Sequence, residues 1–183
     1  MLSRVFFRPR PISITIGSDG VRAFGVTGSS DANGVTYNNW PVPWPGVWQL
    51  EMVGGGGGGG GTDPAYYRPG AAGTSSAYTV STLTLRGLAT TRVGAGGTAG
   101  TSGASPTAGG VGRASLINAQ GNVINSATGT GGAAGVFGTS YNPTPGASAW
   151  PYTGQAGRGG QGATDTWNAS SGIAGACRLK LVG

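Results

Sequence analysis

The sequence contains no histidine, one cysteine and few charged residues, and these shortages exclude several kinds of chemistry. Without histidine, the chain lacks the commonest general base and the commonest metal ligand. Cys177 alone cannot form an intrachain disulfide, and its place in an alternating apolar tail predicts a small buried residue. The five acidic residues are spread thinly, and no carboxylate pair stands out. We therefore predict no catalytic site, no metal and no cofactor.

Long apolar runs are also missing from the sequence. The first apolar stretch ends after three residues, where Arg8, Pro9, Arg10 and Pro11 interrupt it. This is shorter than the h-region of a secretory signal, and nothing approaches the roughly 18 apolar residues of a membrane helix. We expect a protein that is made in the cytoplasm and does not insert into a membrane.

The chain is basic, but its positive charges are scattered. Eleven basic residues against five acidic ones give a net charge of +6. Binding along a nucleic-acid backbone requires clustered charge, and only Arg4, Arg8 and Arg10 lie close together in the sequence. These three arginines would equally suit an acidic partner protein. Nucleic-acid binding is therefore kept only as an alternative function.

Glycine is abundant instead, with 40 residues, and eight of them are consecutive at 54–61. This run follows directly on an alternating apolar and polar stretch at 47–53, which predicts a strand. One interpretation is a flexible linker. The other is polyglycine II, an extended helix with three residues per turn, which is stable only beside other extended segments. A phosphate-binding loop is excluded, because Thr62, Asp63 and Pro64 follow the glycines where lysine and serine or threonine are needed.

The remaining pattern predicts strands separated by glycine-rich stretches. We expect a strand at 3–7, a hairpin of 12–16 with 21–26, and a loop at 27–46. Further strands are expected at 47–53, at 75–85 with one register change, at 90–93 and at 176–182, with a hairpin of 114–117 and 122–126. No segment has useful helical periodicity, and glycine at this density disfavours helices.

The predicted fold is all-β, a jelly-roll-like sandwich interleaved with glycine-rich polyglycine II segments and preceded by a small N-terminal β appendage. Residues 1–45 form the expected N-terminal attachment segment and linker. Residues 46–183 form the expected glycine-rich β domain. The apolar fraction of 37% is sufficient only for a thin core, and a small domain with a thin core favours oligomerisation.

The order of motifs over about residues 46–183 resembles a known family. It runs from the strand and polyglycine at 47–61 to a Ser-Ala-Tyr-Thr-Val strand at 76–80, then to Val-Gly-Ala-Gly-Gly at 93–97, and closes with Gly-Ala-Cys-Arg-Leu at 175–179. This is similar to the glycine-rich domain of bacteriophage minor tail and tail-fibre tip proteins. The resemblance implies a homotrimeric virion protein at the distal end of a tail, made in the infected cell. It also implies contact with other tail proteins and a host cell-surface glycan.

Two sets of residues are candidates for these contacts. Aromatic residues with nearby arginines suit glycan binding, although aromatics equally fill cores and interfaces. The receptor-binding candidates are Tyr66, Tyr67, Arg68, Tyr141, Trp150, Tyr152 and Trp167, with Arg158 near them in sequence. The tail-attachment candidates are Arg4, Phe6, Phe7, Arg8 and Arg10.

Two other classes of function stay open at this point. An envelope-degrading tail enzyme would need two carboxylates, such as Asp63 and Asp165, but their spacing does not argue for a pair. An ice-binding or cell-wall glycine-rich protein is the other class. The expected absence of a secretory signal argues against both an ice-binding protein and a cell-wall protein.

The segment around Trp40, Trp44 and Trp48 is expected to be extended, because prolines exclude a helix there.

Overall fold

The computed structural model describes residues 13–16, 26–65, 68–132, 135, 141–164 and 167–182. Nine β-strands occur in this part of the chain, and no α-helix does, so no described helix could cross a membrane. The strands are β1 (Ser13–Ile16), β2 (Ser29–Asp31), β3 (Gly34–Pro41), β4 (Gly46–Val53), β5 (Tyr78–Leu85), β6 (Leu88–Gly94), β7 (Leu116–Ala119), β8 (Asn122–Asn125) and β9 (Ala176–Leu181).

The strands form two antiparallel sheets that face one another. One sheet has the order β1-β9-β4-β5, and the other has the order β2-β3-β6-β7-β8. Successive strand residues point to opposite faces of a sheet. In β4, Trp48, Leu50 and Met52 therefore point into the core, where they pack with Tyr37, Trp40 and other buried residues of the second sheet. This arrangement confirms the predicted all-β sandwich.

The indole groups of the buried tryptophans find hydrogen-bond partners. The indole N–H of Trp40 donates to the hydroxyl of Thr91 at 3.1 Å, and that of Trp48 donates to the carbonyl of Trp44 at 3.1 Å. Satisfied donors allow these large side chains to be buried at low cost. Trp40 and Trp48 are thus core residues, whereas Trp44 is half exposed.

Several strand predictions are correct. The strand at 47–53 is β4, the strand at 90–93 lies in β6, and the closing strand is β9. The hairpin of β7 and β8 turns through Gln120 and Gly121, which have φ angles of 52° and 80°. Positive φ at both central residues matches the right-handed twist of the flanking strands.

Two local predictions are wrong. The expected loop at 27–46 contains β2 and β3, because one proline, Pro41, does not prevent pairing at the end of an extended strand. The expected strand at 12–16 contains β1, which pairs with β9, whereas its expected hairpin partner lies almost entirely outside the described residues. The register change expected in 75–85 does not occur, since β5 pairs with β4 continuously from Gly46↔Leu85 to Val53↔Tyr78. The expected strands at 3–7 and 21–25 lie outside the described residues.

The N-terminal strands also belong to the two sheets of the sandwich. β1 pairs with β9, and β3 pairs with β6, so the expected division near residue 45 does not separate one sheet from the other. Pairing partners far along the chain decide this organisation, and local composition does not reveal them.

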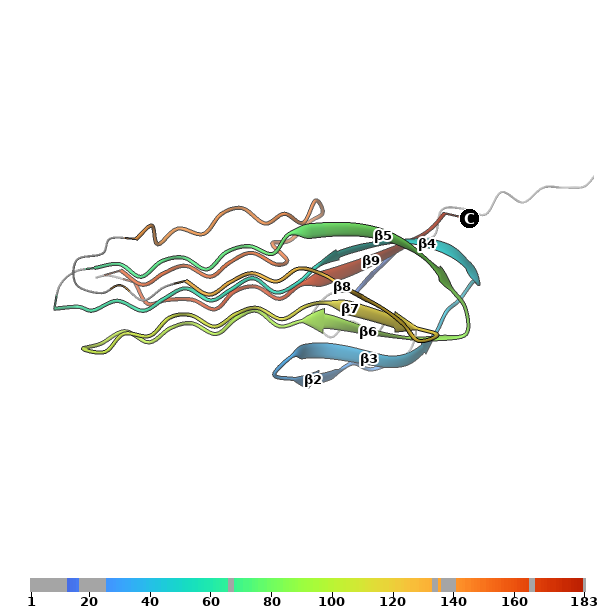
Figure 1. Ribbon diagram of the computed structural model, residues 1–183, viewed down its shortest axis with the longest axis horizontal. Helices are drawn as coiled ribbons and strands as arrows, with labels where there is room; N and C mark the ends of the chain where they lie inside the picture. Colours follow the sequence, from blue (N-terminus) through green and yellow to red (C-terminus); the bar gives the residue numbers. More distant parts are fainter. Residues whose placement is uncertain are drawn as a thin grey trace, which may run out of the picture.

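The glycine-rich segments extend together beyond one end of the sheets (Figure 1). They leave β4, β6 and β8 and return to β5, β7 and β9, so they interrupt the strands along the sequence but do not lie between them in space. The octaglycine segment is buried. Each N–H from Gly55 to Gly61 donates to a carbonyl, and each carbonyl in the same range accepts an N–H, at 2.7 to 3.0 Å.

The hydrogen-bond partners of the octaglycine segment recur every third residue. The N–H groups of Gly55, Gly58 and Gly61 donate to residues 107–113, while those of the intervening glycines donate in turn to 170–173 and 71–74. Three residues per turn is the period of polyglycine II. We interpret these segments as packed polyglycine II helices, because a flexible linker would not hold such a repeating set of bonds.

Six glycine-rich segments surround the octaglycine segment. Three run antiparallel to it and accept its N–H groups, and three run parallel to it and donate to its carbonyls. Each of the six is also hydrogen-bonded to the next, which closes the ring. In order around the ring they are residues 95–103, 107–113, 127–132, 70–76, 157–163 and 170–175. We call the seven segments the glycine bundle.

Close contact of backbones explains why these central positions are glycine. A Cβ atom built on Gly57, Gly58 or Gly59 would lie 1.8 Å from a backbone carbonyl oxygen of a parallel neighbour. A side chain does not fit there unless the neighbouring backbone moves. The bundle therefore has an interior of backbone atoms in place of a side-chain core.

Buried serines join the sheets to the glycine bundle. The hydroxyl of Ser115 donates to the carbonyl of Val53 and accepts the N–H of Gly94. The hydroxyl of Ser76 accepts the N–H of Gly54, and that of Ser126 accepts the N–H of Ser115. These bonds satisfy backbone groups at the point where the strand ladders end.

Candidate functional site

The sequence-predicted aromatic residues separate into two groups in the structure. Trp150 and Tyr152 contact residues of β4, β5 and β9, on the outer face of the first sheet. Arg68 and Trp167 lie at the turns of the glycine bundle far from the sheets, and Tyr141 lies in the segment that returns from that end. The two groups have different surroundings.

At the far end of the bundle, Trp167 is 63% exposed, and it is a large apolar side chain. Its turn is held by the N–H of Thr164, which donates to the Trp167 carbonyl at 2.8 Å, and by the N–H of Trp167, which donates to the Thr164 hydroxyl. The neighbouring Ala163 donates its N–H to the carbonyl of Gly60 in the central segment. The exposed indole thus projects from a backbone that is tied into the bundle.

Arg68 lies at the same end of the molecule. It forms an isolated β-bridge with Asp63, and its carbonyl accepts the hydroxyl of Thr62. Its guanidinium Nε is buried and has no hydrogen-bond partner among the described residues. Tyr141 is half-buried, and the candidates Tyr66 and Tyr67 lie outside the described residues.

Trp150 is buried, so at this position packing accounts for the aromatic residue better than ligand binding does. Its ring lies edge-on to Tyr78 and Tyr152, with centroid distances of 6.1 and 5.1 Å. Trp150 also packs against Val53 and Ala176. These contacts fasten the segment that returns from the glycine bundle onto the outer face of β4, β5 and β9.

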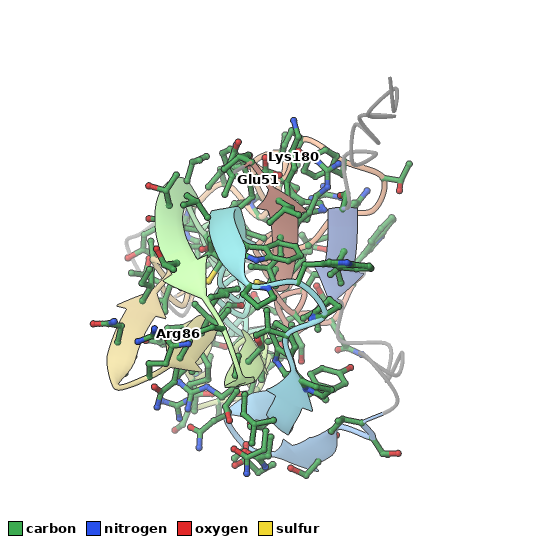
Figure 2. The ribbon with its side chains drawn as sticks, turned by 90° about the vertical axis from the view of Figure 1, so that its right-hand side faces the viewer. Glu51, Arg86 and Lys180 are labelled. Atoms are coloured by element: carbon green, nitrogen blue, oxygen red, sulfur yellow. The ribbon has the colours of Figure 1, made fainter. Side chains whose placement is uncertain are left out.

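A carboxylate anchors this aromatic cluster. Glu51 is buried, accepts the phenol O–H of Tyr152, and forms a salt bridge with Arg178 at 3.3 Å. The Arg178 guanidinium also lies over the Tyr152 ring, 4.2 Å from its centroid. Figure 2 shows Glu51 and Lys180 on one side of the sandwich end and Arg86 on another. Sequence reasoning placed Glu51 in a strand but did not identify its partners, because Tyr152 is 101 residues away.

The environment of this cluster affects proton release from Tyr78. Burial, followed by the negative charge of Glu51, raises the pKa of Tyr78 to about 12. Burial also raises the pKa of Cys177, in the core, to about 12. Both groups keep their protons at neutral pH, and a protonated buried thiol is a poor nucleophile.

The described residues contain no group of three or more metal-ligating side chains. Of the carboxylate pair considered for a glycosidase, Asp165 lies outside the described residues. Glu51 is occupied by Tyr152 and Arg178, which are structural partners. The tail-attachment candidates Arg4, Phe6, Phe7, Arg8 and Arg10 also lie outside the described residues.

Comparison with known proteins adds no relative: no family model matches the chain, and no curated protein matches it.

Proposed function

We propose that this chain is a structural virion protein of a bacteriophage tail that presents host-binding turns at the far end of a glycine bundle. The observation that carries the proposal is the exposed Trp167 on a turn whose backbone is hydrogen-bonded into a bundle with a fully paired central segment. A rigid scaffold lowers the entropy cost of binding, because its loops are already ordered. The resemblance of the motifs to phage tail proteins supports the same proposal.

In this proposal the sandwich and the bundle have different tasks. The sandwich contains the side-chain core and the N-terminal strand β1, which the expected tail-attachment residues precede in the sequence. The bundle holds its turns away from the sheets (Figure 1). The expected partners are other copies of the chain, other tail proteins and a host cell-surface glycan, and the expected location is the virion.

Replacing Trp167 by alanine tests the proposed host contact. We expect phage carrying Trp167→Ala to adsorb to host cells at least about tenfold more slowly, because a central tryptophan contributes roughly 2 kcal/mol or more at many interfaces. Trp44→Ala is the matched control, since Trp44 is also half exposed but lies at the sandwich. Adsorption by intact Trp167→Ala particles at the rate of the control would count against the proposal.

A further inference from the structure

A cavity of about 220 Å³ lies on the side of the glycine bundle. Three segments line it: the outer segment (residues 141–156) at Thr144, the segment containing Arg158 and Gln161, and the segment at 170–173. The last two are adjacent in the ring, because the N–H of Ser170 donates to the carbonyl of Gln161 and that of Ile173 to the carbonyl of Arg158. The walls of the cavity are therefore fixed by backbone hydrogen bonds.

Arg158 supplies an unpaired positive charge to this cavity. Its terminal nitrogen donates to the side-chain oxygen of Gln155 at 2.7 Å, which orients the guanidinium group. Its Nε is buried and has no hydrogen-bond partner, and among the described residues Arg158 forms no salt bridge. A guanidinium with free donors is suited to a carboxylate or a phosphate, which it binds through two parallel hydrogen bonds.

The other lining residues suit a polyhydroxylated ligand. Thr144, Ser170 and Ser171 provide hydroxyl groups, and Gln161 provides an amide. Ser170 accepts the N–H of Gln161 through its hydroxyl oxygen at 2.7 Å, so its O–H remains able to donate. Ile173 is 40% exposed and adds an apolar surface at the same cavity.

The size of the cavity limits the ligand. Its volume corresponds to roughly seven water molecules at about 30 Å³ each. Pockets for drug-sized molecules are larger, at roughly 300–1,000 Å³. One sugar unit, or a fragment of similar size, is therefore the appropriate scale.

From this chemistry we propose that the cavity at Arg158 binds one anionic sugar-like unit, with a carboxylate or phosphate on the guanidinium and hydroxyls on Ser170, Ser171 and Thr144. The inference deepens the proposed function by naming the ligand class for host attachment. Trp167 precedes Ser170 by three residues, so the segment that lines one wall of the cavity continues into the turn with the exposed indole at the far end of the bundle. An anionic glycan also complements the chain's net charge of +6.

Binding of small probes to the purified full-length protein tests this site without requiring a virus. The probes are glucuronate, glycerol phosphate and neutral glucose, followed by calorimetry. We expect at least one of the anionic probes to bind, and glucose to bind much more weakly. Binding of glucuronate alone would identify a carboxylated glycan, and binding of glycerol phosphate alone would identify a phosphate-bearing polymer.

Two substitutions assign the binding to this cavity. Arg158→Gln should weaken binding of the anionic probe by about tenfold to a hundredfold, because hydrogen bonds to charged groups are the stronger ones. Arg113→Gln is the matched control, as it removes the same charge from an exposed position on a different segment of the bundle and should leave binding unchanged. If Arg158→Gln does not fold, Ser171→Ala should still weaken binding a few-fold, since Ser171 is an exposed lining residue.

Several results would overturn the site. These are no binding of either anion, equal binding of glucose, or equal weakening by Arg113→Gln and Arg158→Gln. The outcome is independent of the adsorption test at Trp167. Binding that depends on Arg158, together with normal adsorption of Trp167→Ala phage, would leave the site standing and remove the proposed function. Loss of adsorption by Trp167→Ala phage, without binding of either anionic probe, would support the proposed function and remove the site.

Discussion

Cys177 and Tyr78 hold their protons more tightly in the folded protein than in the unfolded chain. The ordinary pKa values of about 9 and 10 rise to about 12 in both cases. A raised folded pKa contributes stability that is fully present below the unfolded pKa. That stability is lost as the pH rises toward the folded value. The relevant window is therefore about pH 9 to 12.

We predict that the free energy of unfolding decreases between pH 9 and pH 12, and that Cys177→Ala reduces this decrease. Cys177 is fully buried, so its share is about 1.4 kcal/mol for each pH unit in this window. Urea unfolding at pH 8.5 and pH 11 would measure it in both proteins. An equal pH dependence in the wild type and the variant would contradict the assignment to Cys177.

The glycine bundle depends on single glycines that tolerate no side chain. A Cβ on Gly58 would lie 1.8 Å from the carbonyl oxygen of Thr98, whereas Gly146, in the outer segment, has no atom within 4 Å of such a Cβ. We predict that Gly58→Ala lowers the free energy of unfolding by about 3 kcal/mol or more, the upper range for overpacking. Gly146→Ala should change it by less than about 0.5 kcal/mol.

Thermal unfolding of the two alanine variants would measure this difference. Amide hydrogen exchange provides a second readout, because Gly55 to Gly61 each donate a buried hydrogen bond and should exchange slowly in the wild type. Equal stability of Gly58→Ala and Gly146→Ala, or fast exchange throughout the octaglycine segment, would mean that the bundle is not an ordered interior in solution.

The sequence predicts elements better where the signal is local. The hairpin of β7 and β8 follows from alternation around Gln120 and Gly121, and β4 follows from its apolar and polar pattern. The local sequence over β2 and β3 predicts a loop, because glycine, serine, asparagine and proline are common there, yet β3 is stabilised by pairing with β6, about 50 residues away. Distant pairing overrides local propensity in such strands.

The candidate site was predictable only in part for the same reason. Aromatic side chains in glycine-rich stretches identified Trp167 as a candidate, and it is exposed. They also suggested Trp150, whose burial depends on Tyr78 and on Val53, far away in the sequence. The cavity at Arg158 forms where three separate segments meet, and no single stretch of sequence contains it.

At the scale of the whole molecule, the outer face of the first sheet leaves apolar side chains exposed. Val47 and Val182 are 41% and 50% exposed and lie beside each other, because the N–H of Val182 donates to the carbonyl of Val47. Val80, which is 52% exposed, lies farther along the same face, where it pairs with Glu51. Adjacent exposed apolar residues commonly mark protein interfaces. This face is where we expect copies of the chain to associate.

We predict a homotrimer, with a mass in solution three times the 17.9 kDa of one chain. A lysine at position 80 would place a charge in the buried interface, so Val80→Lys should shift the protein toward the monomer. Val123→Lys is the matched control, because Val123 is equally exposed but lies on β8 in the other sheet. Sedimentation equilibrium measures all three proteins. A monomeric wild type would remove the trimer from the proposal, and dissociation by Val123→Lys alone would move the interface to the second sheet.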